Sequence, residues 1–99
     1  MAKFDIFNNQ EGAGYLLDVQ SDLLNGLNTR VVVPILPKDS APKPAQRLNP
    51  VFNINGETFI MATQYIAAVS ESELYDGSGS LADHQQEISE ALDMLFLGF

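Results

Sequence analysis

The stretch VFNINGETFIM, residues 51–61, predicts a β-hairpin, and the rest of the fold can be argued outward from it. Val51–Ile54 and Glu57–Met61 are short runs of β-forming residues that flank Asn55-Gly56. Asn-Gly is the dipeptide that most readily adopts the two positive φ angles of a type I′ turn, whose twist suits paired strands. We therefore expect one antiparallel strand pair here.

Three further segments have strand-like composition, and a fourth is a candidate. Thr29–Leu36 (TRVVVPIL) is the strongest, because three consecutive β-branched valines favour an extended, mostly buried backbone. Pro34 cannot donate to a central ladder, so we expect an edge, a bulge or a bend near it. Phe4–Asn8 and Tyr15–Gln20 are shorter, and a Gly-Ala-Gly sequence marks a hairpin or loop between them. Ile66–Leu74 alternates imperfectly and is the candidate for a further strand.

Two segments are expected to interrupt the strands. Residues 37–50 hold four of the five prolines among polar residues, which is typical of a loop. Asp76–Gly79 (DGSG) is interpreted as a short turn, because no strand-and-helix context for a phosphate-binding loop surrounds its glycines.

The last fifth of the chain has helical periodicity, and we expect one α-helix over about residues 81–96. Ser80 is positioned to cap its start. The arc expected to pack on the sheet consists of Leu81, Ile88, Ala91, Leu92, Leu95 and Phe96, with His84 at its flank. These elements predict a single domain, residues 1–99, that is all-β with one C-terminal helix and forms a small antiparallel barrel or half-barrel.

Composition excludes several kinds of site. The chain has no Cys and only one His, which leaves no disulfide, no thiolate nucleophile and no zinc site built from Cys or several His, so we expect no metal and no cofactor. No apolar run approaches the roughly 20 residues that a bilayer span requires, and the first residues contain no hydrophobic targeting core. We therefore expect a cytoplasmic protein without membrane contact.

The net charge of −8 lies entirely in the second half of the chain. Residues 1–47 hold five acids and all five bases, whereas residues 48–99 hold eight acids and no Lys or Arg. Such a surface repels a phosphate backbone. Two interpretations remain open: a solvated face that keeps a small protein soluble, or a surface that meets a basic partner.

The predicted helix ends in a way that a purely structural helix would not. Helical geometry places Leu97 and Met94 among acidic residues on the wet face, where together with Phe99 they form an exposed apolar cluster, unless the end is frayed. A helix C-terminus favours cations, yet this one ends with Glu90, Asp93 and a free carboxylate. The pattern indicates an interaction protein that works through its C-terminal helix.

The chain resembles the CcdB family of toxins from bacterial toxin–antitoxin modules, with matching order and spacing over essentially its whole length. Four segments carry the resemblance: Leu17–Leu24 with its DVQSD sequence, Thr29–Pro34, Pro50–Ile54 and the LFLGF ending, residues 95–99. The resemblance implies a small SH3-like antiparallel β-barrel, the CcdB/Kid/MazF-like toxin fold, with a C-terminal helix and a homodimeric state.

The resemblance also implies a function and its residues. A family member of this kind is not an enzyme but a type II toxin that binds the DNA gyrase A subunit, traps the cleaved gyrase–DNA complex and is neutralised by a CcdA-like antitoxin. It contacts DNA only indirectly, through gyrase. The gyrase-binding segment maps onto Leu97, Gly98 and Phe99, with Asp93 and Phe96 beside them, and a second element tied to toxicity maps onto Leu23-Leu24.

The sequence departs from the family at two of these positions, which keeps alternatives open. Leu97 replaces a tryptophan and loses its stacking surface and indole donor, and Asp93 replaces an asparagine. One alternative is an attenuated toxin homologue that binds only antitoxin. Another is a ribonuclease toxin on the same barrel, whose candidate residues would be His84, Arg30 and Arg47 with carboxylates such as Asp5 or Asp18. We expect His84 to be a half-buried packing residue and Arg30 to form a structural ion pair with Asp22 or Asp18.

Overall fold

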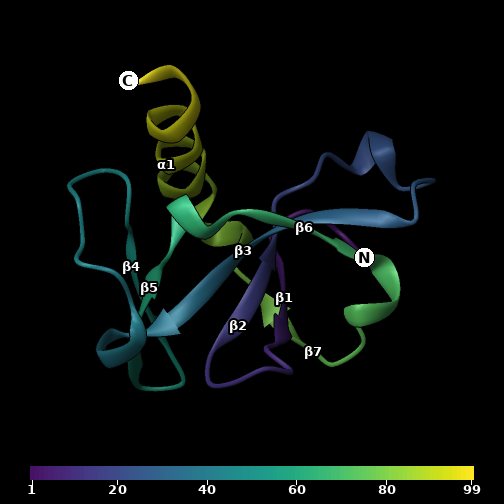
Figure 1. The fold of residues 1–99 in the computed structure, drawn as a ribbon, viewed down its shortest axis with the longest axis horizontal. Coiled ribbons are helices and arrows are strands. Elements are labelled where there is room, and N and C mark those ends of the chain that lie inside the picture. The colour runs from purple at the N-terminus through teal and green to yellow at the C-terminus, as the bar shows by residue number, and fades with distance from the viewer.

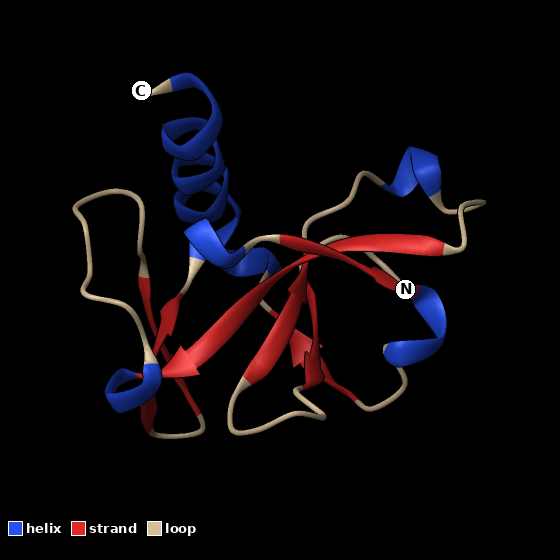
Figure 2. Ribbon diagram, in the orientation of Figure 1, coloured by secondary structure: helices blue, strands red, loops and turns tan.

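A computed structural model describes all residues, 1–99, as a curled antiparallel sheet with one helix at its end (Figures 1 and 2). The strands follow the order β4-β5-β3-β2-β1-β7, and β6 pairs with β3 beside this path. The predicted fold class is therefore confirmed: a mainly β half-barrel with a C-terminal helix. The elements are β1 (Asp5–Asn8), β2 (Tyr15–Asp18), β3 (Thr29–Pro37), β4 (Val51–Ile54), β5 (Glu57–Met61), β6 (Ala67–Ser70), β7 (Gly77–Ser80) and α1 (Gln85–Leu97).

Strand β3 is the centre of the sheet, and Pro34 lies where it changes partners. One edge of β3 pairs with β2, while the other pairs with β6 over residues 29–32 and with β5 over residues 35–37. The Val19 amide donates to the Val31 carbonyl, so residue 31 turns its backbone groups toward β2. Because successive residues of an antiparallel strand turn their backbone groups to opposite edges, residue 34 turns its own away from β2. The missing N–H of Pro34 therefore falls in the gap between β6 and β5, as a bend or edge at this position requires.

The predicted hairpin is confirmed. Strands β4 and β5 pair from Val51↔Ile60 to Ile54↔Glu57, which leaves Asn55 and Gly56 as a two-residue connection. Their φ angles are 53° and 85°, both positive, as a type I′ turn requires. The Gly56 amide also donates to the Asn53 side chain at 3.1 Å.

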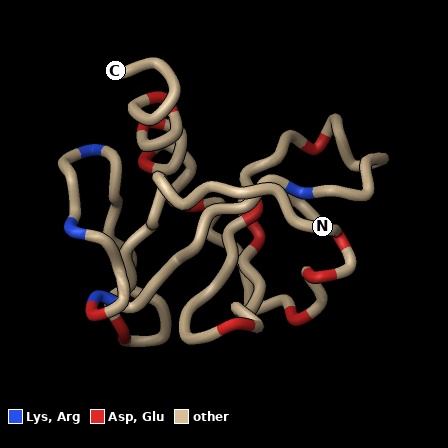
Figure 3. The backbone as a smooth tube through the Cα atoms, viewed as in Figure 1, with Lys and Arg blue, Asp and Glu red and all other residues tan.

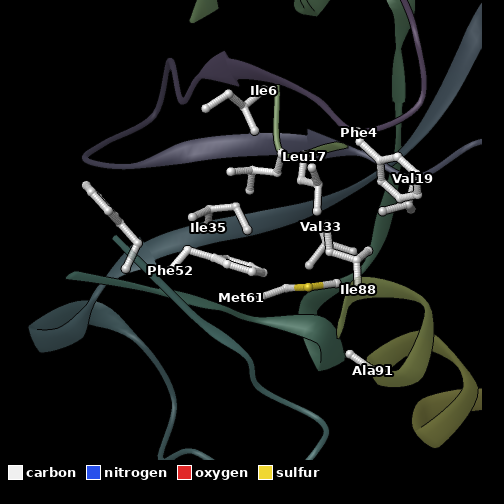
Figure 4. Close-up of a cluster of buried hydrophobic side chains, with 12 residues drawn as sticks. Phe4, Ile6, Leu17, Val19, Val33, Ile35, Phe52, Met61, Ile88 and Ala91 are labelled. Carbon is white, nitrogen blue, oxygen red and sulfur yellow. The ribbon is translucent and has the colours of Figure 1, made fainter. Parts of the chain in front are cut away.

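The main core lies on one face of the sheet, where alternate residues of the central strands meet α1 (Figure 4). Leu17, Val33 and Ile35 point into it from β2 and β3, and all three are fully buried. Helix α1 contributes Ile88 and Ala91, also fully buried. The predicted packing arc is thus correct for the first turns of the helix.

Phe96 was expected in this arc, and that expectation is wrong. Its side chain is 67% exposed, because the second half of α1 extends beyond the sheet and has no strand beneath it (Figure 1). Leu92 and Leu95 are only partly buried for the same reason. The helix therefore has a packed first half and a largely free second half.

The interpretation of residues 76–79 as a turn is also wrong, because Gly77–Ser80 forms edge strand β7, paired with β1 through a register shift. Asn8 holds this strand: its amide donates to the Asp76 carbonyl at 2.9 Å, and its side chain bonds Asp76 and Ser78. Three long-range polar contacts thus compensate for poor strand propensity.

The helical segment starts with a 3-10 turn, Ala82–His84, before α1 begins at Gln85. The Ser80 hydroxyl accepts the Ala82 amide at 3.1 Å, so it caps the 3-10 turn and not α1 itself. His84 is half-buried as predicted, with its ring 4.8 Å from that of Phe52. No helix in the structure has the length and apolar character needed to cross a membrane.

Two glycines with positive φ should respond differently to alanine. Gly56 has open space around a built Cβ, so Gly56→Ala should cost only the conformational strain, about 1 kcal/mol. At Gly14, φ is 95° and a Cβ would collide with the carbonyl oxygen of Ile35 on β3, so Gly14→Ala should cost about 2 kcal/mol or more. Urea unfolding measures both; equal losses would contradict the predicted close approach of the Gly14 backbone to β3.

Candidate functional site

The end of α1 is an exposed apolar surface, which we call the C-terminal cluster: Phe96, Leu97 and Phe99. Their side chains are 67%, 60% and 71% exposed. Gly98 ends the helix in the left-handed conformation, with φ at 81°, and its amide donates to the carbonyls of Asp93 and Met94. The cluster is thus presented on a fixed helix end with a defined cap.

The electrostatics of this helix end are unusual. Glu87, Glu90 and Asp93 are exposed along α1, and the last turn carries no basic residue (Figure 3). The carbonyl ends of the helix add further negative charge. Glu90 and Asp93 form no ion pair within the chain, although Arg47 shares a cleft with Glu87 and Glu90. The surface therefore suits a partner that combines an apolar contact with a basic group.

Leu23 and Leu24 lie on a 3-10 turn, Asp22–Leu24, far from the C-terminal cluster. Leu23 is 95% exposed, more than any other large apolar residue, and Leu24 is also exposed. Figure 1 shows this turn at the opposite end of the molecule from the end of α1. Within one chain, the structure therefore does not bring the two predicted gyrase-binding segments together.

A buried ion pair holds the Leu23-Leu24 turn in place. Arg30 on β3 bonds Asp18 on β2 through Nε at 3.0 Å and Nη2 at 2.5 Å, with both side chains buried. Its Nη1 donates to the Asn25 side chain at 2.7 Å, and Asn25 ends the turn. The predicted structural ion pair is confirmed with Asp18 as the partner, and Asn25 is a positioning residue that no sequence pattern indicated.

Burial raises the pKa of the Asp18 carboxyl above its ordinary value of 3.8, because lost hydration outweighs the hydrogen bonds from Arg30 and the Gln20 amide. The folded protein then binds this proton more tightly than the unfolded chain does. The contribution of Asp18 to stability is therefore present at acidic pH and declines as the pH rises through the folded-state pKa.

The candidate ribonuclease residues are only partly brought together. Arg30 and Asp18 are committed to the buried pair, and Asp5 accepts the Ala2 amide at 2.9 Å. Arg47, however, lines a polar cleft of about 270 Å³ between residues 44–50 and α1, together with Glu87 and Glu90. The His84 Nδ1 atom is 3.2 Å from Glu87, which places the imidazole next to this cleft.

Comparison with solved structures places the fold among toxins. An endoribonuclease in complex with its cognate antitoxin, from a mycobacterial species, matches with a TM-score of 0.77 and 16% identity, covering 100% of this chain and 98% of that chain. An endoribonuclease from a mycobacterial species matches with a TM-score of 0.79 and 16% identity, covering 100% and 94%. The Mycobacterium tuberculosis toxin MazF-mt6 matches with a TM-score of 0.73 and 14% identity, covering 93% and 94%. At this level of identity the matches show that the chain shares the fold of these proteins.

Residues 3–98 match the model of the family described as CcdB protein, and the chain belongs to the CcdB family. The recognition made from the DVQSD segment and the LFLGF ending is therefore confirmed. The chain is a toxin of a toxin–antitoxin module.

One prediction from the resemblance is contradicted. The resemblance implies a toxin that is not an enzyme, but proteins described as endoribonucleases share this fold over the whole chain. The expectation that the chain is not an enzyme is therefore wrong as a conclusion from the resemblance.

Replacing Arg30 should show how strongly the buried pair supports this region. In Arg30→Met the Asp18 carboxylate stays buried without its cation, so the free energy of unfolding should fall by about 3 to 5 kcal/mol at neutral pH. Urea unfolding measures the loss. The matched double variant Asp18→Leu/Arg30→Met removes both charges and should recover much of it. A single variant as stable as a surface substitution would contradict the role given to the pair.

Proposed function

We propose that this toxin binds the DNA gyrase A subunit through the end of α1 and traps the cleaved gyrase–DNA complex. The observation that carries the proposal is the C-terminal cluster, three bulky apolar side chains exposed beside Glu90 and Asp93, whose carboxylates form no ion pair within the chain. Leu97, Gly98 and Phe99 form the contact, with Phe96 and Asp93 at its border. Such a mixture favours a target surface with an apolar pocket and an arginine.

The substitution of leucine for the family tryptophan changes the character of this contact. Leu97 still offers a bulky apolar anchor, whereas the aromatic component is supplied by Phe96 and Phe99 on either side. Asp93 adds a charge in the same turn and increases the attraction to a basic group. Binding should therefore weaken as salt rises, because exposed charges are screened over about 10 Å at 0.1 M salt.

The proposal includes a homodimer in the cytoplasm and neutralisation by a CcdA-like antitoxin. The free second half of α1, with partly buried Leu92 and Leu95, offers an apolar flank to a second copy related by a two-fold axis. In the dimer, Leu23-Leu24 of one chain adds a second exposed apolar element to the toxin surface. The solved complex of a similarly folded toxin with its cognate antitoxin supports the antitoxin as a partner.

RNA cleavage is the second candidate function, and the polar cleft favours it together with the endoribonuclease fold matches. Phosphodiester cleavage needs a group that moves a proton and a cation near the phosphate. His84, oriented by Glu87, supplies the first, and exposed Arg47 supplies the second. The negative charge of Glu90 in the same cleft repels a phosphate, so RNA cleavage is only the second candidate function.

Truncation separates the gyrase contact from folding. A chain ending at Phe96 loses only exposed residues, so it should keep its melting temperature and should sediment as a dimer, as the full chain of 10.8 kDa should. It should no longer bind gyrase A or stall gyrase on DNA. Gly98→Arg should have the same effect, because it adds a side chain where the backbone meets the target and strains a left-handed residue.

The matched control is a core change. Ile88→Ala removes a fully buried side chain and should cost about 2 to 5 kcal/mol, with gyrase binding reduced only as far as folded protein is reduced. Stalling of gyrase by the truncated chain at the level of the full chain would overturn the C-terminal mechanism.

A cleavage assay tests the second candidate independently. If the cleft acts on RNA, the purified toxin should cut single-stranded RNA, and Arg47→Ala and His84→Ala should each abolish the cut. Truncation after Phe96 should leave it unchanged, since no deleted residue lines the cleft. Intact RNA after incubation with folded toxin would rule out this function.

A further inference from the structure

The outer face of the central strands is apolar, although no helix covers it. Val33 and Ile35 of β3 point into the core, so Val32 and Pro34 point to the opposite face, together with Leu16 of β2. Residues 71–76 cover part of this face through Leu74. A cavity of about 400 Å³ remains beside them, lined by Leu16, Val32 and Pro34.

Aromatic rings and carboxylates form the other walls of this cavity, which we call the outer cavity. Tyr65 and Tyr75 line it, and both are exposed. Glu11, from the loop between β1 and β2, and Glu73, from the 3-10 turn after β6, are its only charged lining residues. Glu73 is held in place because its carboxylate accepts the Ser70 amide at 3.2 Å in a capping box. No Lys, Arg or His lines the cavity.

This combination selects for one kind of occupant. Tyrosine faces attract cations, and two carboxylates at the rim strengthen that attraction. The apolar floor accepts the methylene stem of a long basic side chain or an adjacent aliphatic residue. A nucleic-acid phosphate would meet two negative charges and no cation.

We propose that the outer cavity binds a lysine or arginine side chain of a partner peptide that carries an apolar residue beside it. No α1 residue lines the cavity, so this surface is separate from the C-terminal cluster and from the polar cleft. The inference therefore goes beyond the proposed function and does not depend on it. It gives the toxin a second docking surface with its own chemical preference.

Isotope-resolved titration tests the proposal. The probe is a capped hexapeptide of alternating leucine and arginine, added to 15N-labelled toxin, with a leucine–glutamate hexapeptide and a short oligouridylate as comparisons. The arginine peptide should shift the amides of Leu16, Ala67, Val69 and Tyr75, and neither comparison should do so. Shifts confined to α1 would show general attraction to an acidic protein and would overturn the proposal.

Charge-matched variants make the test specific. Glu11→Gln/Glu73→Gln keeps the capping box, since glutamine also accepts the Ser70 amide, and should weaken peptide binding about fivefold or more. Asp39→Asn/Glu57→Gln removes the same charge from exposed residues that do not line the cavity and should leave binding within about twofold. Tyr75→Ala should also weaken it, and unchanged melting temperatures establish that each variant is folded.

Three results would refute the cavity as a basic-peptide site. One is that the two charge-matched double variants weaken binding of the arginine peptide equally. Another is equal binding of the glutamate peptide or the oligouridylate. The last is a set of shifts at the cavity that grows with toxin concentration in the absence of peptide, which would identify a second copy of this chain as the occupant.

Discussion

The sheet depends on how strand β3 is shared among three neighbours, and Pro34 at its centre determines this sharing. A proline in a strand paired on both edges would leave a carbonyl without its donor. Here β5 ends at Met61 and β6 begins at Ala67, and the Ala62 amide donates to the Pro34 carbonyl at 2.8 Å. The chain between β5 and β6 must therefore cross the break, which brings the 3-10 turn Thr63–Tyr65 against α1 and places Tyr65 at the outer cavity.

Local chemistry was sufficient to predict the elements whose signals are contained in a few residues. The Asn55-Gly56 turn, the valine-rich strand β3 and the buried side of α1 around Ile88 all follow from propensity and period. Strand β7 could not be predicted in this way, since Gly77–Ser80 is extended only because β1 and Asn8 lie beside it. The exposure of Phe96 escaped prediction for a related reason: helical period shows which face is apolar, but not where the sheet beneath it stops.

The candidate functional residues show the same division. Leu97 and Phe99 could be named because the end of an amphipathic helix is visible in sequence as apolar residues among acids, whereas Gly98 was named from the family resemblance. The separation of Leu23-Leu24 from that end could not be seen, nor could the contact between Arg30 and Asn25 that fixes it. The outer cavity collects residues from the loop after β1, from three strands and from residues 65–75, and no spacing rule unites them.

The capping box of Ser70 and Glu73 also protects the open edge of strand β6. The Glu71 amide donates to the Asn28 carbonyl, on the side of β6 that faces β3. Because successive backbone groups of a strand face opposite edges, the Ser70 amide faces the open edge of β6, where it already donates to the Glu73 carboxylate. Only the backbone groups of Ala68 and the Ser70 carbonyl stay free along this edge, too few to template another strand. A carboxylate in that position also repels an approaching backbone carbonyl. The short strand beside the central proline thus offers little open edge to which another strand could pair.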